Sequence, residues 1–276
     1  MIVRKSIGSV STSSHQVHRY AVAVLSRILS HTWATLGAVF WPLSGWLAVI
    51  AVPYEIAVGA LESAAPDTTN SKAVVQAIAV LGFLLLVSPI ATVLTIRFAE
   101  AHDNGTPRSP RRAIGEGFER MPTFAGTIVL LGLMVAGAVI PFIVLAGTIG
   151  SAGGLVGIAI AFAAVLYIVA RFGLAIPALV IECLGPTAAL RRSSEATAGS
   201  LRGMLGSLLV IGLIAAAFSL AGGLLGNVGS GAGAIGFRRL GDLIAFVLGT
   251  PVSTLGTLYL FLDRRAATKP AEPAPW

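Results

Sequence analysis

Long apolar runs recur along this chain, and they restrict what it can fold into more than any other feature. Six runs separate the polar segments, at 33–53, 74–96, 124–148, 154–176, 204–226 and 240–262. A helix of about 20 apolar residues crosses the hydrocarbon core of a bilayer. Only 11% of the 276 residues are charged, against roughly 25% in soluble domains. The sequence therefore predicts an all-α fold, a polytopic membrane helix bundle with six transmembrane helices.

Lysine and arginine are distributed unevenly between the two sets of alternating polar segments. One set holds fifteen of these residues, and the other set holds three, which are Lys72, Arg238 and Arg239. Loops rich in Lys and Arg stay in the cytoplasm. Both termini are therefore expected in the cytoplasm, as an even number of crossings requires. The formal charge of +7 is interpreted as this topology signal, and we expect no nucleic acid as a partner.

The basic segments are predicted to form amphipathic cytoplasmic surface helices. Three such segments are expected, at 17–31, 110–121 and 185–203. In the first of them, Val24 and Ile28 fall on one helical face and Arg27 falls largely on the other. A basic amphipathic helix of this kind lies at a membrane surface and suits anionic lipids.

The two ends of the chain are predicted to lie outside the bundle. Residues 1–14 are expected to be a mobile cytoplasmic arm, and residues 15–263 to form the six-helix membrane domain. No apolar signal-peptide region follows the early charges, so the first crossing is expected to act as an uncleaved insertion signal. Residues 264–276 end in the proline-rich stretch KPAEPAPW and are expected to be a disordered cytoplasmic tail.

The stretch GSGAGAIGFRRLGD, residues 229–242, has glycines in the G-x-G-x-x-G spacing of a dinucleotide-binding loop. These glycines are Gly231, Gly233 and Gly236. Such a loop follows a β-strand and needs an acidic residue about twenty positions later. Here an apolar run of crossing length precedes it, and the later position holds Gly256. We therefore interpret the glycines as an outer turn, with Asp242 as a helical partner of the preceding arginines, and expect no nucleotide or other cofactor.

Ionisable groups within a membrane span are functional hypotheses by default, and the region with Arg171 and Glu182 qualifies most clearly. On an unbroken helix they would share a face about 16 Å apart, and Pro177 is a point where the path can bend. In one interpretation they line a polar crevice or hold an anionic lipid headgroup. In the other, which we favour, Arg171 extends to the cytoplasmic interface and Glu182 pairs with Arg191 or Arg192.

Other reactive groups do not form a recognisable catalytic set in the sequence. The stretch EAHDNG, residues 100–105, groups Glu100, His102 and Asp103, but Asn104-Gly105 predicts a turn with solvated polar neighbours. The single cysteine, Cys183, excludes a multi-cysteine zinc site. No Ser–His–Asp set, Walker loop or H-E-x-x-H motif occurs. We therefore expect no catalytic residues, no metal site and no enzyme activity.

The segment 171–210 carries a pattern in which an arginine and a proline-containing apolar run precede a glutamate, a glycine and a basic helix. The matching residues are Arg171, Pro177, Glu182, Gly185, Ala189, Leu190, Arg192 and Ser193. In this pattern the chain resembles the bacterial family named after the membrane domain of glycerophosphodiester phosphodiesterase, and it is similar to the YciC-like proteins. The resemblance implies a six-helix protein of the bacterial cytoplasmic (inner) membrane. It implies no phosphodiesterase activity, because a catalytic barrel of roughly 250 residues does not fit into this chain.

These observations favour one function and leave an alternative from another class. The first is a non-catalytic integral inner-membrane protein that serves as a scaffold, an assembly partner or a lipid-interacting module. Its expected partners are membrane lipids, anionic ones in particular, and a possible protein in the membrane. The alternative is a small transporter or permease subunit with a polar pathway near Arg171 and Glu182. The residues proposed to hold a lipid or to line a crevice are Arg171, Glu182 and Arg192.

Overall fold

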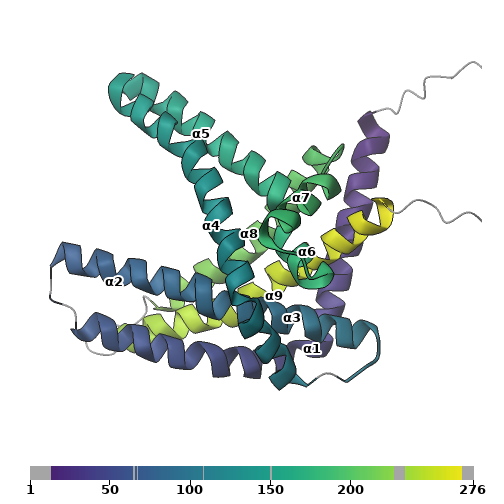
Figure 1. Cartoon of the computed structure of the whole chain (residues 1–276), viewed down its shortest axis with the longest axis horizontal. Helices are drawn as coiled ribbons and strands as arrows, with labels where there is room; N and C mark the ends of the chain where they lie inside the picture. The colour runs from purple at the N-terminus through teal and green to yellow at the C-terminus, as the bar shows by residue number, and fades with distance from the viewer. Residues whose placement is uncertain are drawn as a thin grey trace, which may run out of the picture.

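The computed structural model describes residues 14–64, 66, 68–107, 109–149, 151–226 and 234–268, and every regular element in these ranges is a helix (Figure 1). In chain order the helices are α1 (Ser14–Ala64), α2 (Thr69–Gly82), the π-helix η1 (Phe83–Val87), α3 (Ser88–Asp103), α4 (Pro110–Ile149), α5 (Ser151–Phe172), α6 (Ala175–Glu182), α7 (Pro186–Ala196), α8 (Leu201–Gly226) and α9 (Ala234–Thr268). The all-α fold is confirmed for the described part of the chain.

Six stretches of helix are long and apolar enough to cross a membrane, counted among the described residues. They are Ala23–Ala64, Thr69–Asp103, Pro110–Phe142, Leu155–Glu182, Leu201–Leu224 and Arg239–Ala267. Each predicted crossing overlaps one of them. The number of crossing-length helices agrees with the prediction from the sequence. The chain is therefore compatible with a multi-pass membrane protein.

The long helices form three hairpins, which pair α1 with α2, α4 with α5, and α8 with α9 (Figure 1). Their tips point to the left of Figure 1, whereas the first turn of α1 and the last turn of α9 lie at the right. The α4–α5 hairpin diverges toward the upper left from the other two. The large apolar side chains along its outer half, such as Leu155 and Phe162, are accordingly exposed.

Two of the three expected surface helices are continuous with the crossing that follows them, which differs from the prediction. Segment 17–31 is the first part of α1, and segment 110–121 is the first part of α4. Val24 and Ile28 are buried in the core of the bundle, so this apolar stripe contacts other helices of the chain. No glycine or proline follows the first segment until Gly37, and nothing in it stops a helix.

The termini differ slightly from their predicted limits. Residues 1–13 and 269–276 lie outside the described residues, and α1 begins at Ser14. At the other end, α9 continues through Thr268, so residues 264–268, which were assigned to the tail, are helical. These residues lack a helix-breaking side chain, and the first proline of the tail is Pro270.

The predicted break between Arg171 and Glu182 exists, but it lies at Gly173 and not at Pro177. Helix α5 ends at Phe172 and α6 begins at Ala175. A Cβ atom on Gly173 would lie 2.6 Å from the carbonyl oxygen of Val169 and 2.9 Å from Leu208 Cδ1, so only glycine fits there. Pro177 falls in the first turn of α6, where its missing N–H costs no intrahelical hydrogen bond.

A second irregularity interrupts the second crossing-length stretch. Between α2 and α3 the chain forms the π-helix η1, in which the Ser88 N–H donates to the carbonyl of Phe83, five residues earlier. Pro89 follows immediately and has no N–H to donate. The wide turn accommodates this missing donor without ending the helix.

Helices α8 and α9 approach each other closely at Gly222. A Cβ atom on this residue would collide with the carbonyl oxygen of Gly241 and would lie 2.8 Å from the Cβ of Ala245. Small residues allow such close helix packing in apolar surroundings. The core that these helices share with the others is filled by large side chains, among them Phe124, Met204, Leu255 and Phe261.

Candidate functional site

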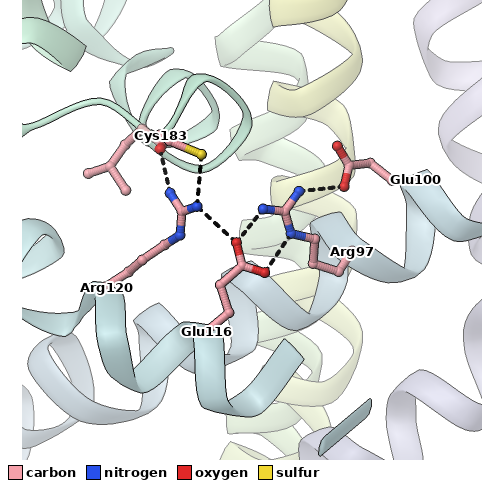
Figure 2. Close-up of polar contacts among 6 residues, drawn as sticks. Arg97, Glu100, Glu116, Arg120 and Cys183 are labelled. Atoms are coloured by element: carbon pink, nitrogen blue, oxygen red, sulfur yellow. Dashed lines mark hydrogen bonds and ion pairs between the residues drawn. The ribbon is translucent and has the colours of Figure 1, made fainter. Parts of the chain in front are cut away.

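A row of alternating charges connects α3, α4 and α6 (Figure 2). Arg97 of α3 donates from Nε to Oε2 of Glu116 on α4 at 2.8 Å, and its Nη2 donates to Oε1 of the same carboxylate. The Nη1 atom of Arg97 donates to Oε2 of Glu100 at 2.6 Å. Arg97 is 11% exposed and Glu116 is 20% exposed. This bidentate pair is therefore shielded from solvent, where a charged hydrogen bond is strongest.

Arg120 extends the row from Glu116 to α6. Its Nη2 atom lies 2.9 Å from Oε1 of Glu116 and 3.1 Å from Sγ of Cys183, and its Nη1 atom donates to the carbonyl of Leu179 at 2.9 Å. Cys183 has a φ of 54° and ends α6 in the left-handed conformation. In Figure 2 the Arg120 guanidinium lies between Glu116 and this end of α6.

Small residues and a tight turn bring these charges together. Gly105 has a φ of +63°, which a glycine adopts without strain, and it reverses the chain after α3 at the predicted Asn104-Gly105 turn. Beside Glu116, a Cβ atom on Gly117 would lie 2.9 Å from the Cα atom of Ile90. Helices α3 and α4 are therefore close enough for Arg97 to reach Glu116.

A cavity of about 750 Å³ opens beside this row of charges. Its lining consists of Arg97, Thr106, Pro107, Ser109, Arg112, Ala113, Glu116, Glu119 and Arg120. Arg112 is exposed, and its guanidinium has no hydrogen bond or ion pair with a described residue. Thr106 and Ser109 add hydroxyl groups near the start of α4. We call this cavity the arginine pocket; its donor groups are those that bind a phosphate oxygen.

The residues singled out from the sequence lie around α6 and α7. The Nε of Arg192 is 3.0 Å from Oε2 of Glu182, and the Nε of Arg265 is 3.4 Å from Oε1. The expected pairing of Glu182 with Arg192 is confirmed. The carbonyl of Arg171 accepts hydrogen bonds from Ser193 Oγ at 3.0 Å and from the hydroxyl of Thr197. No ion pair among the described residues joins Arg171 to Glu182.

A hydrogen-bonded group that the sequence did not predict joins α1, α3 and α9. The hydroxyl of Tyr259 lies 2.8 Å from Oγ1 of Thr35 and donates to Oδ2 of Asp103 at 3.2 Å. The Nε2 of His31 is 3.8 Å from Oδ1 of Asp103. Asp103 is exposed at the end of α3, as the sequence predicts, and it also contacts side chains of α1 and α9.

At the hairpin tips, the expected partner of the arginines is wrong. Arg239 donates from Nη1 to Glu55 at 2.7 Å and from Nη2 to Glu62 at 2.5 Å, and it does not pair with Asp242. The Arg239 guanidinium thus pairs with two glutamates of α1 and not with the single aspartate on its own helix. The side chain of Arg238 lies outside the described residues.

One residue of the glycine-rich stretch differs from the interpretation of that stretch as a turn. Gly236 belongs to the first turns of α9, whereas Gly231 and Gly233 lie outside the described residues. No group of three or more His, Cys, Asp or Glu side chains that could hold a metal ion occurs in the described part of the chain.

Only part of the row of charges could be predicted from the sequence. Glu116 and Arg120 are four positions apart, a spacing that pairs charges on a helix. The contact of Arg97 with Glu116 spans nineteen positions and depends on how α3 packs against α4. The exposed arginines at the start of α4 gave the only local signal for the arginine pocket.

Comparison with known proteins adds no assignment. No known protein family, curated protein or solved structure matches the chain. The family suggested by the residues between Arg171 and Ser193 therefore stays a prediction.

Proposed function

We propose that the chain is a non-catalytic integral protein of the bacterial cytoplasmic membrane, with both termini in the cytoplasm, and that it is a lipid-interacting scaffold. Six helices of crossing length support the membrane location. The first turn of α1 and the last turn of α9 lie at the same end of the molecule (Figure 1). This arrangement and the excess of arginines at that end support the orientation. The suggested kinship with the six-helix family is part of the same proposal.

The observation that carries the lipid-binding part is the arginine pocket. Arg97 and Arg120 are largely neutralised by Glu116 and Glu100, whereas Arg112 and the acidic Glu119, which both line the pocket, have no ion-pair partner among the described residues. Arg112 can therefore pair with an anionic group that enters the pocket. A phosphate that also accepts hydrogen bonds from the hydroxyls nearby would be held as a lipid headgroup is held at a membrane surface.

The scaffold part follows from the row of charges. Removing one member of a shielded ion pair leaves the other charge uncompensated, which is costly. The row therefore holds α3, α4 and the end of α6 in one arrangement behind the pocket. A rigid polar end of this kind suits a protein that presents a fixed surface to lipids or to another membrane protein.

The alternative function is a small transporter or permease subunit with a polar pathway near Arg171 and Glu182. Broken helices are typical of transporters, and two breaks occur within crossing-length stretches, at η1 and at Gly173. Glu182, however, has a partner on each carboxylate oxygen, Arg192 and Arg265. We therefore rank this pathway second.

Mass spectrometry of the chain purified with its native lipids tests the lipid proposal. We expect an anionic phospholipid to remain bound to the unchanged chain and to Arg111→Ala, since Arg111 is exposed and does not line the pocket. The same lipid should be lost from Arg112→Ala. Equal lipid retention in the two variants would refute the arginine pocket as a headgroup site, and selective loss in Arg171→Ala would favour the site near α6.

Cys183 provides a direct test of the orientation because it is the only cysteine and is exposed. A membrane-impermeant maleimide should label it in inverted inner-membrane vesicles and not in intact spheroplasts. The doubly changed chain Cys183→Ser/Ser63→Cys carries its thiol at the hairpin-tip end of α1 and should show the opposite pattern. Labelling of Cys183 in spheroplasts would reverse the proposed topology.

A further inference from the structure

A second cavity lies at the other end of the bundle, between α1, η1, α8 and α9. Its volume is about 400 Å³, and its lining consists of Glu55, Phe83, Ala215, Ser219, Asp242, Ala245, Phe246, Gly249, Thr250 and Ser253. We call it the tip crevice. It shares no residue with the arginine pocket.

The tip crevice follows one face of α9 for three helical turns. Asp242, Phe246, Gly249, Thr250 and Ser253 recur at the spacing of a single helical stripe, and eleven residues of helix span about 16 Å. Asp242 is near the start of the crossing-length stretch Arg239–Ala267, and Ser253 is at its middle. The crevice therefore runs from the hairpin-tip end to half the depth of the helix.

Two serine hydroxyls of the tip crevice are available to an occupant as acceptors. Ser219 and Ser253 donate their hydroxyl hydrogens to carbonyls of their own helices, those of Ala215 at 3.3 Å and Thr250 at 3.1 Å. Their oxygen lone pairs stay available to an occupant. The lining includes the carboxylates of Glu55 and Asp242 and no cationic side chain.

Only one of the two carboxylates is neutralised. Glu55 pairs with Arg239 at 2.7 Å, whereas the described residues provide Asp242 with no hydrogen bond or ion pair. Within the described residues, the exposed carboxylate of Asp242 is therefore the one acidic group of the lining without an ion-pair partner. That charge attracts a cation with hydrogen-bond donors.

The aromatic residues and the size of the cavity indicate which kind of cation fits. Phe83 and Phe246 form an edge-to-face pair with ring centroids 5.4 Å apart, and aromatic faces attract ammonium groups. A volume of 400 Å³ is much larger than a bare metal ion needs and lies in the range of small-molecule pockets, about 300–1,000 Å³. The alanine and glycine positions of the lining offer contact to an apolar body.

We propose that the tip crevice binds a protonated organic amine with an apolar body, with its ammonium at Asp242 and its body between Phe83, Phe246 and the α8–α9 face. The site extends beyond the lipid-binding scaffold, since it lies at the opposite end of the helices and uses other residues. Its existence does not depend on headgroup binding at Arg112.

Calorimetric titration of the full-length chain in nanodiscs of zwitterionic lipid tests the site, with empty nanodiscs as the blank. Phenethylammonium is the probe, and phenethyl alcohol has the same apolar body without the charge. We expect the ammonium to bind and the alcohol to bind at least about tenfold more weakly. Equal binding of the two compounds, no binding of the ammonium, or binding of sodium ions alone would overturn the proposal.

Matched variants assign the binding to the tip crevice. Asp242→Asn keeps the shape of the side chain and should weaken phenethylammonium binding about tenfold. Asp263→Asn changes the other aspartate of α9, which does not line the crevice, and should leave the affinity unchanged. If Asp242→Asn fails to fold, Ser253→Ala and Thr250→Val replace it, each with an expected loss of a few-fold. Unchanged affinity in the folded crevice variants would overturn the assignment.

Discussion

Glu116 of α4 binds Arg97 of α3 through both carboxylate oxygens while it forms an ion pair with Arg120 one helical turn further on. One carboxylate thus satisfies two arginines from two helices. Each arginine also has another partner, Glu100 for Arg97 and the carbonyl of Leu179 for Arg120. Glu116 is the link whose removal separates the two halves of the row.

Replacing Glu116 by glutamine should lower the free energy of unfolding by about 2 kcal/mol, because two shielded guanidinium groups lose their shared anion. Glu119→Gln is the matched change on the same helix. Glu119 is exposed and has no partner among the described residues, so the effect should stay below about 0.5 kcal/mol. Denaturant titration in mild detergent measures both values, and equal values would contradict the central role of Glu116.

The close approach of α8 and α9 predicts opposite effects for two neighbouring glycines. Gly222→Ala places a methyl group against Gly241 and Ala245 and should destabilise the chain by about 2 kcal/mol through overpacking. Gly223→Ala meets nothing within 4 Å and should be neutral or stabilising by up to about 1 kcal/mol, since alanine favours helix more than glycine does. Thermal unfolding of the two variants compares them directly.

Tyr259→Phe should destabilise the chain by about 1.5 kcal/mol, because Thr35 is buried and loses the partner of its hydroxyl. The phenol also donates to Asp103, so α1, α3 and α9 are loosened together. Tyr167→Phe removes a phenol that is 53% exposed and should have no measurable effect. If both variants unfold at the same temperature, the hydrogen bonds of Tyr259 make no net contribution to the stability of the chain.

Two ion pairs around α7 should differ in strength although both join arginine to glutamate. Glu182 is 18% exposed and pairs with Arg192 and Arg265, whereas Glu195 is 50% exposed and, among the described residues, pairs with Arg191 alone. Glu182→Gln should cost about 2 kcal/mol, and Glu195→Gln should cost less than about 1 kcal/mol because exposed pairs are screened by water. Added salt should reduce the effect of Glu195→Gln at lower concentrations than the effect of Glu182→Gln, because the Arg191–Glu195 pair is more exposed.

The helices themselves could be predicted from the sequence because apolar runs of crossing length leave few alternatives. The close packing at Gly222 and the turn at Gly105 also carry local signals, a small-residue spacing and an Asn-Gly pair. The pairing of Glu182 with Arg192 could be anticipated for a similar reason. Ten positions separate these residues, and a glycine-proline turn brings the chain back between them.

Contacts that depend on tertiary packing could not be predicted in this way. Arg239 pairs with Glu55, 184 positions away, and the local rule for charges on one helix suggested Asp242. The position of the break near Arg171 depends on the closeness of Leu208, a residue of another helix. The charge row and the arginine pocket likewise require the packing of α3 on α4 at Gly117.

The π-helix η1 also sets which side of α2 faces α1. A turn with five residues per hydrogen bond contains one residue more than an α-helical turn, and each residue of an α-helix rotates the chain by about 100°. Deletion of one residue between positions 83 and 88 would turn α2 by about 100° relative to α3 and carry Phe83 away from Tyr54 and Phe246.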